Sequence, residues 1–470
     1  MRVVALALAA GGLGMLWWSS TAAGRGRRRE ARFVSRHQVG ALRRRHGEAN
    51  RLPLGTFATP RWRRTRTHLA SPTGDSVLIL GPTRSGKTSS LVVPALLSWQ
   101  GPIVAASVKD DLVGETAAWR RQQGPCFVVD PSAPHGELGA CFDPVTLSTS
   151  FEAARAMAAD LATPPQAVAV SGEMAFWSQL AAKLLAPLLL AASVTDADLA
   201  TVISWVDRRA LGEPWEVLED HGLERALDAL GASLARDERQ LGSVYATLEA
   251  ILEPLAMTVD PAARPLDPVQ LLRQSGTLYL CAPTHQQRRF QALFTATTSA
   301  VLRHGFDLAR RQGGRLDRPL LVVLDEAAAI APLEELDVLA ATCAGHGITL
   351  VTCFQDLAQI RARYQDRATT VVNNHRTRVL LGGLADEGAT SMLGTMTGTA
   401  REPVRPRREA SALGERRALI EPHELRAQPA FTGVVISGRM SAVRLRLLPW
   451  WKQRDLRMRG PGRPRGVSVG

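Results

Sequence analysis

Residues 79–90, ILGPTRSGKTSS, have the types and spacing of a phosphate-binding loop. They fit the pattern G-x-x-x-x-G-K-[ST] with Gly81, Gly86, Lys87 and Thr88. Such a loop turns backbone N–H groups toward phosphate, its lysine reaches the β- and γ-phosphates, and its hydroxyl binds Mg²⁺. We therefore predict that ATP and Mg²⁺ bind here, through nine successive residues: Gly81, Pro82, Thr83, Arg84, Ser85, Gly86, Lys87, Thr88 and Ser89.

Lysine is rare in this chain, which makes its presence in the loop informative. Only four of the 57 Lys and Arg residues are lysine, and Lys87 is one of them. A lysine approaches a phosphate as a compact point charge, whereas the planar fork of arginine does not suit that axial approach. The alternative interpretation is a Gly-rich turn before an ordinary helix.

A pair of acidic residues follows a second apolar segment. In RPLLVVLDEAAAI, a predicted strand over Leu320–Leu324 ends in Asp325 and Glu326. A carboxylate at the end of a neighbouring strand can hold Mg²⁺, and the next one can orient or deprotonate the attacking water. We assign Mg²⁺ to Thr88 and Asp325, and water activation to Glu326. The alternative is a solvated helix N-terminus, where acidic residues are favoured in any case.

Three further positions are candidates for the same site. Gln355 follows another apolar strand and could sense the γ-phosphate, although a helix cap at Asp356 explains the same polarity. Arg376 is a candidate arginine finger that reaches the nucleotide of a neighbouring subunit, and Arg378 is a second one. Lys109 is a weaker candidate for contact with nucleotide or a subunit interface. The predicted catalytic set is therefore Lys87, Asp325, Glu326, Gln355 and Arg376.

Short apolar runs separated by helical segments predict an α/β fold with a parallel sheet. The predicted strands are Val77–Leu80, Ile103–Ala106, Cys126–Val129, Thr277–Cys281, Leu320–Leu324, Thr349–Cys353, Arg378–Leu381 and Gly433–Ile436. Apolar residues at three-to-four spacing instead predict helices at Phe151–Leu161, Met174–Ala192, Leu223–Leu234 and Leu241–Leu255. We predict a P-loop ATPase domain over residues 71–146 and 272–448, interrupted by an all-helical insertion over residues 147–271.

Basic residues are concentrated at the two ends of the chain. The net charge is +13, of which the region from Arg25 to Arg66 carries +12 and the region from Arg439 to Arg465 carries +8. Residues 67–438 therefore carry about −8. We predict an Arg-rich juxtamembrane linker over residues 25–70 and a basic tail over residues 449–470. In the tail, Trp450 and Trp451 either stack on bases or pack as a terminal strand.

The first residues are apolar enough to cross a membrane. No charged residue occurs from Val3 to Ala23, a run of 21 residues, and the cluster Arg25–Arg29 follows at once. A positive flank on the C-terminal side predicts a single-pass anchor over residues 1–24 in the cell (inner) membrane, with the body in the cytoplasm. The alternative is a cleaved signal peptide. The five cysteines are scattered, which favours reduced core thiols over a zinc site or disulfides.

Six sequence segments, in this order, resemble the type IV secretion coupling proteins of conjugation, of the TraG/TraD type. They cover roughly two thirds of the chain, from about Gly74 to Gly383, and they read LILGPTRSGKTSSLVVPALL, SVKDDL, FWSQLAAKLLAPLL, GTLYLCAP, LLVVLDEAAAIAPLEELDVLAATCAGHGITLVTCFQDLAQI and VVNNHRTRVLLGG. The resemblance implies a membrane-anchored, RecA-like ATPase that assembles as a homo-hexamer. It also implies that residues near Leu320–Ile360 belong to a segment that recognises a TraM-type accessory protein.

The implied function is ATP-driven transfer of DNA. A coupling protein recruits a relaxase bound to single-stranded DNA and drives the strand into a type IV secretion channel. Two alternatives remain open at this stage. One is a motor of the FtsK/HerA type that moves duplex DNA or protein, and the other is a nucleotide-gated receptor that recruits cargo without hydrolysing ATP.

Overall fold

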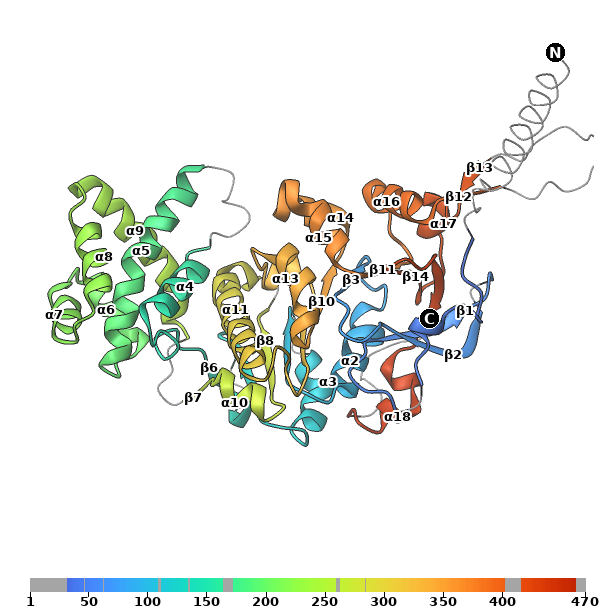
Figure 1. Cartoon of the computed structure of the whole chain (residues 1–470), viewed down its shortest axis with the longest axis horizontal. Coiled ribbons are helices and arrows are strands. Elements are labelled where there is room, and N and C mark those ends of the chain that lie inside the picture. The colour runs from blue at the N-terminus through green and yellow to red at the C-terminus, as the bar shows by residue number, and fades with distance from the viewer. Residues whose placement is uncertain are drawn as a thin grey trace, which may run out of the picture.

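The computed structural model describes residues 32–461 except 46, 62, 109–110, 134–135, 164–171, 259–262, 284 and 402–415. The predicted anchor over residues 1–24 and the candidate Lys109 lie outside the described residues. Figure 1 shows an α/β body with a block of helices at one end.

In the described part of the chain, the body is built on one eleven-stranded sheet with the order β2-β1-β15-β14-β11-β3-β10-β9-β4-β8-β5. The seven strands from β11 to β5 are parallel to one another, and almost every residue in them is buried. Burial on both faces explains why these strands read as continuous apolar runs. The α/β prediction with a large, mostly parallel sheet is confirmed. The parallel strands are β3 (Val77–Leu80), β4 (Ile103–Ser107), β5 (Cys126–Val129), β8 (Thr277–Cys281), β9 (Leu320–Leu324), β10 (Ile348–Phe354) and β11 (Thr377–Leu381).

One edge of the sheet is antiparallel, which differs from the prediction. The strand expected at Gly433–Ile436 is present, but as β14 it runs antiparallel to β11. Part of the region expected to be a linker instead forms two strands: β2 lies at the edge of the sheet and pairs with β1, and β1 pairs with β15. In β2 the residue Arg64 is exposed while Thr67 is buried, as in a strand with one solvated face. The antiparallel strands are β1 (Pro53–Ala58), β2 (Arg64–Ala70), β14 (Thr432–Ser437) and β15 (Val443–Arg446).

Helices cover both faces of the sheet. In β3, Leu78 and Leu80 pack into one hydrophobic core, whereas Val77 and Ile79 pack into another on the opposite face. The alternation is the two-residue period of a strand buried on both sides. The helices around the sheet are α2 (Val93–Ser98), α3 (Asp111–Arg120), α10 (Pro268–Arg273), α11 (Gln287–Arg311), α12 (Ala327–Ile330), α13 (Leu336–Thr342), α14 (Leu357–Tyr364), α15 (Ala368–Asn374), α16 (Glu387–Thr397), α17 (Pro422–Arg426) and α18 (Arg454–Arg457).

A block in which the structure describes six helices lies beyond the β5 edge of the sheet, drawn in green at the left of Figure 1. The block packs around α5, which contacts α4, α7, α8 and α9. Among the described helices, the stretch Glu173–Val194 within α5 is the one long and apolar enough to span a membrane, and 61% of its apolar segment is buried inside the protein. The six helices are α4 (Phe151–Leu161), α5 (Gly172–Val194), α6 (Leu199–Asp207), α7 (Gly212–Asp220), α8 (Glu224–Leu234) and α9 (Glu238–Ala256). Two short strands, β6 (Ala140–Cys141) and β7 (Arg264–Pro265), pair beside it.

The C-terminal segment folds back onto the body. Trp450 is fully buried, and its indole N–H donates a hydrogen bond of 2.8 Å to the Glu115 carboxylate in α3. The Arg459 guanidinium lies over the Trp119 ring and donates 2.8 Å to the Leu97 carbonyl oxygen. Trp450 is therefore unable to stack on a base and packs in the core, whereas Trp451 is only partly buried, so base stacking by Trp451 stays a prediction. The tryptophans form a 3₁₀ turn (Trp450–Lys452) instead of a strand.

Glu115 makes stability depend on pH. Burial raises the pKa of this carboxyl from 4.5 to about 7, against the opposing effect of the Trp450 hydrogen bond. The folded state then binds the proton more tightly than the unfolded state, so stability falls as pH rises from about 4.5 to about 7.

We predict that Glu115→Gln raises the thermal unfolding midpoint more at pH 8 than at pH 5, because glutamine keeps an acceptor for Trp450 and removes the buried charge. The matched control is Glu249→Gln on α9, where the side chain is exposed. An equal change at both pH values for Glu115→Gln would contradict the assignment.

Candidate functional site

The loop after β3 has the backbone of a tight phosphate cradle. Gly81 begins it and donates its N–H to the Phe354 carbonyl oxygen of β10 at 3.1 Å. Arg84 and Gly86 have φ angles of 62° and 93°, in the left-handed region. A Cβ on Gly86 would lie 2.8 Å from the Phe431 ring, so both the φ angle and the neighbouring ring require glycine. The loop leads into a π-helical turn (Thr88–Val92) that continues as α2.

Lys87 is held inside the loop. Its side chain is 7% exposed, and its ammonium donates hydrogen bonds to the carbonyl oxygens of Gly81 and Pro82. Ser85 is also buried, and its hydroxyl has no hydrogen-bond partner within the described part of the chain. A buried cation and an unpartnered hydroxyl in one loop fit an anionic ligand such as a phosphate group. The neighbouring Thr83 and Arg84 lie exposed on the outside of the loop.

Asp325 meets the phosphate loop at the carboxyl edge of the sheet. β10 lies between β3 and β9, and in register Phe354 pairs with Leu80 while Thr352 pairs with Leu324. The three strands therefore end close together. The Thr88 hydroxyl donates a hydrogen bond of 2.7 Å to the Asp325 carboxylate. Hydroxyl and carboxylate oxygens are the hard ligands that Mg²⁺ prefers, so this pair fits the predicted metal site.

The electrostatics of Asp325 depend on its neighbours. Burial raises the pKa of this carboxyl to about 6, while the Thr88 hydrogen bond and the Lys87 charge act in the opposite direction. Cys353 lies beside it on β10, and the pKa of that thiol is raised by burial first and by the Asp325 charge second. No motif singled out Cys353, because its place beside Asp325 follows from the strand order.

Glu326 has an unusual backbone. Its φ and ψ angles are 73° and 56°, a left-handed conformation that is uncommon for residues other than glycine. Such strain costs about 1 kcal/mol or more and is concentrated at functional sites. Phe431, which packs on Gly86, is likewise left-handed with φ of 60°. No sequence pattern indicated either feature.

The other predicted residues lie in different places. Gln355 follows β10 next to the phosphate loop, and its backbone N–H is bonded to the Gln359 side chain at 3.0 Å. Asp356 caps α14 by accepting from the Gln359 N–H, so the cap interpretation of this position is correct. The γ-phosphate role of Gln355 stays a prediction.

The structure does not bring the two arginines to Lys87. Arg376 comes just before β11, whose first residue Thr377 pairs with Val77, the first residue of β3. Arg376 therefore lies at the amino ends of the parallel strands, whereas the phosphate loop lies at their carboxyl ends. Its side chain is 73% exposed and stands 3.8 Å from Asp75. Arg378 donates instead to the carbonyl oxygens of α15. An arginine finger at Arg376 therefore requires a neighbouring subunit and stays a prediction.

The comparison with protein families gives one match over residues 54–463, to the family described as Type IV secretory system Conjugative DNA transfer. The match includes the phosphate loop, the helical block and the Asp325 strand. The chain belongs to this family. The resemblance to type IV coupling proteins is confirmed by this match and by the relatives below.

Curated relatives of this chain come from two bacteria. A Conjugal transfer protein TraG of Escherichia coli is 29% identical over 322 residues, which are 62% of this chain and 49% of TraG. Protein VirD4 of Agrobacterium fabrum (strain C58) is 31% identical over 93 residues, which are 20% of this chain and 14% of VirD4. The chain thus matches about half the length of TraG.

Solved structures of the conjugative coupling protein TrwB share the fold. The sulphate complex of TrwBdeltaN70 superposes with a TM-score of 0.69 at 16% identity, covering 89% of this chain and 94% of TrwB. The TrwB complex with ADP and Mg²⁺ superposes with a TM-score of 0.66 at 16% identity, covering 90% of this chain and 94% of TrwB. TrwB has also been solved with GDPNP and with ADPNP.

We predict that Gly86→Ala weakens ATP binding at least about tenfold, because alanine at this φ is strained and its Cβ would collide with Phe431. Calorimetric titration with a non-hydrolysable ATP analogue measures the effect. Gly114→Ala in α3 is the control, since a Cβ there meets nothing within 4 Å. Unchanged affinity in Gly86→Ala would show that this loop geometry does not hold nucleotide.

Proposed function

We propose that this chain is an ATPase that drives DNA transfer through a type IV secretion channel. Its phosphate loop, residues 81–89, binds ATP, with Lys87 at the β- and γ-phosphates. Thr88 and Asp325 hold Mg²⁺, which when bound neutralises charge that develops on the phosphates. Glu326 orients and deprotonates the attacking water, Gln355 senses the γ-phosphate, and Arg376 reaches the nucleotide of the next subunit.

The observation that carries this proposal is the 2.7 Å hydrogen bond between Thr88 and Asp325. It joins two segments that are 237 residues apart in the chain and supplies two oxygen ligands at the mouth of the phosphate loop. The TrwB complex with ADP and Mg²⁺ has the same overall fold, which supports the same chemistry here.

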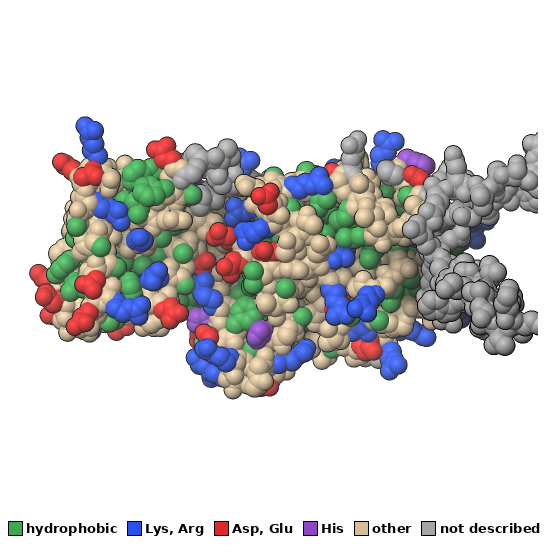
Figure 2. Space-filling view, turned by 45° about the horizontal axis from the view of Figure 1, so that its top comes forward, with side chains coloured by type: hydrophobic (Ala, Val, Ile, Leu, Met, Phe, Trp, Pro, Cys, Tyr) green, Lys and Arg blue, Asp and Glu red, His purple; other side chains and the backbone are tan. Residues whose placement is uncertain are grey.

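The charge of the helical block supports recruitment through a protein partner. Residues 147–271 contain eighteen Asp and Glu against eight Lys and Arg, and Figure 2 shows acidic side chains gathered at the outer end of the block. A phosphate backbone is repelled by such a surface, whereas a protein with a complementary basic face is attracted. In our proposal the block contacts the relaxase, and the DNA strand is held elsewhere.

The proposed assembly is a homo-hexamer anchored in the cell membrane by residues 1–24, with the ATPase body in the cytoplasm. It receives a relaxase bound to single-stranded DNA and passes the strand to the secretion channel. Membership in the conjugative DNA transfer family supports this assignment.

We predict that the full-length protein hydrolyses ATP faster when single-stranded DNA is added. Lys87→Ala and Glu326→Gln should each lower the turnover number at least about a hundredfold. Lys87→Ala removes the contact with the phosphates, and Glu326→Gln removes the general base. Glu335→Gln is the matched control, since this nearby carboxylate is exposed. A coupled phosphate-release assay measures the rates.

The same assay separates the alternatives. Preferential stimulation by duplex DNA would favour a motor of the FtsK/HerA type. Nucleotide binding without turnover, in wild type and variants alike, would favour a nucleotide-gated receptor. Wild-type activity in Glu326→Gln would contradict the assigned base.

A further inference from the structure

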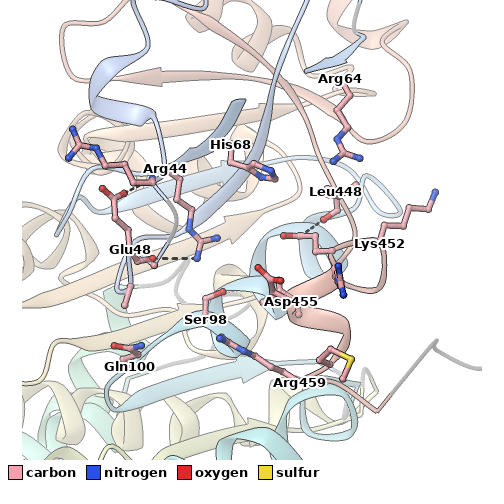
Figure 3. A pocket seen from close by; sticks show the side chains of 17 residues that line it. Arg44, Glu48, Arg64, His68, Ser98, Gln100, Leu448, Lys452, Asp455 and Arg459 are labelled. Atoms are coloured by element: carbon pink, nitrogen blue, oxygen red, sulfur yellow. Dashed lines mark hydrogen bonds between the residues drawn. The ribbon is translucent and has the colours of Figure 1, made fainter. Parts of the chain in front are cut away.

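A large cavity lies away from the phosphate loop, between strand β2 and the C-terminal segment around α18. Its volume is about 890 Å³, within the range of small-molecule sites. The walls come from residues 44, 45 and 47–49, strand β2, the end of α2 and the C-terminal segment around α18. Figure 3 shows side chains from these segments converging on one space.

The cavity is strongly basic. Six cationic side chains line it against two carboxylates: Arg44, Arg45, Arg64, Lys452, Arg454 and Arg459 against Glu48 and Asp455. One of the carboxylates, Glu48, is already paired with Arg51, which is not part of the wall. The positive charge of the cavity is therefore incompletely compensated.

The basic side chains act on one another across the cavity. The pKa of Arg44 is lowered by burial first, and then by the charges of Arg51 and Arg459. The pKa of His68 is lowered by burial and by Arg64 and Arg44. Figure 3 shows the guanidinium groups of Arg44 and Arg64 facing this space, whereas the Arg459 guanidinium is bonded to the Leu97 carbonyl oxygen at the rim. An anion placed among them would relieve this repulsion.

A second observation points to a ligand. Ser98, the last residue of α2, lines the cavity and is only 8% exposed. Its hydroxyl is buried and has no hydrogen-bond partner among the described residues. A buried hydroxyl without a partner costs free energy unless a ligand or water completes it.

The lining residues favour a compact anion such as a phosphate group over a DNA strand. Guanidinium groups bind phosphate oxygens with two parallel hydrogen bonds. None of the described residues that line the cavity is Phe, Tyr or Trp. Single-strand sites depend on such rings to stack the bases, so a compact phosphate group fits this cavity better than a DNA strand.

We propose that this cavity is a second anion site, separate from the phosphate loop, which binds a small phosphate-bearing ligand. Arg44 and Arg64 hold the phosphate oxygens, and the Ser98 hydroxyl donates to one of them. The phosphate comes either from a free polyphosphate compound or from the head group of an anionic phospholipid. The site is independent of the function proposed for the phosphate loop.

The test uses the full-length chain carrying Lys87→Ala, which disables the phosphate loop. Pyrophosphate binding is measured by calorimetry, and binding to phosphatidylglycerol vesicles by co-sedimentation, with phosphatidylcholine vesicles as reference. We expect one of these probes to bind, and Arg44→Gln with Arg64→Gln to weaken it at least about tenfold. A response to pyrophosphate identifies a free compound as the source, and a response to vesicles alone identifies a lipid.

The matched control is Arg61→Gln with Arg63→Gln. These exposed arginines lie in the turn before β2, outside the cavity, and their loss changes the net charge equally. Thermal unfolding midpoints check that both pairs fold. Equal weakening by the two pairs, or no binding of either probe, would overturn the proposal. The proposal would also be overturned if a single-stranded oligonucleotide bound more tightly than both probes and its affinity fell in the variant with Arg44→Gln and Arg64→Gln.

Discussion

A carboxylate buried at the end of a strand must be compensated, and much of this structure is arranged around that requirement at Asp325. Removing a charge from water is costly unless hydrogen bonds and opposite charge replace the lost hydration. Here the Thr88 hydroxyl and the Lys87 ammonium do so, and both belong to the phosphate loop. The loop and the acid are therefore mutually dependent, although they are far apart in the chain.

The sheet register makes this compensation possible. Because β3, β10 and β9 are adjacent and parallel, with Leu80 and Phe354 paired, their carboxyl ends form one edge. Other contacts fix the strands in place. The buried Arg120 donates to the carbonyl oxygens of Trp99, Gly101 and Ser275, which ties α3 to the starts of β4 and β8. At the far side of the loop, Phe431 closes the space behind Gly86.

The sequence predicted those features that depend on local pattern. The strands at Leu320–Leu324 and Thr277–Cys281 were predicted to the residue, because fully buried parallel strands are continuous apolar runs with clear ends. The meeting of Thr88 with Asp325 was predicted from motif chemistry. The strands β1 and β2 were not predicted, because the many arginines of this region indicated a linker. A strand with one solvated face can nevertheless include an exposed arginine such as Arg64. The strain at Glu326 depends on three-dimensional context and leaves no local signature.

The most direct test of the central claim is a double-mutant cycle on the two side chains that meet. The affinity for a non-hydrolysable ATP analogue is measured calorimetrically with and without Mg²⁺ in wild type, Thr88→Val, Asp325→Asn and the double variant. If both residues hold one Mg²⁺, either single change abolishes most of the Mg²⁺-dependent gain, and the two effects are non-additive by at least about 1 kcal/mol. Additive effects within about 0.5 kcal/mol would contradict a shared metal site.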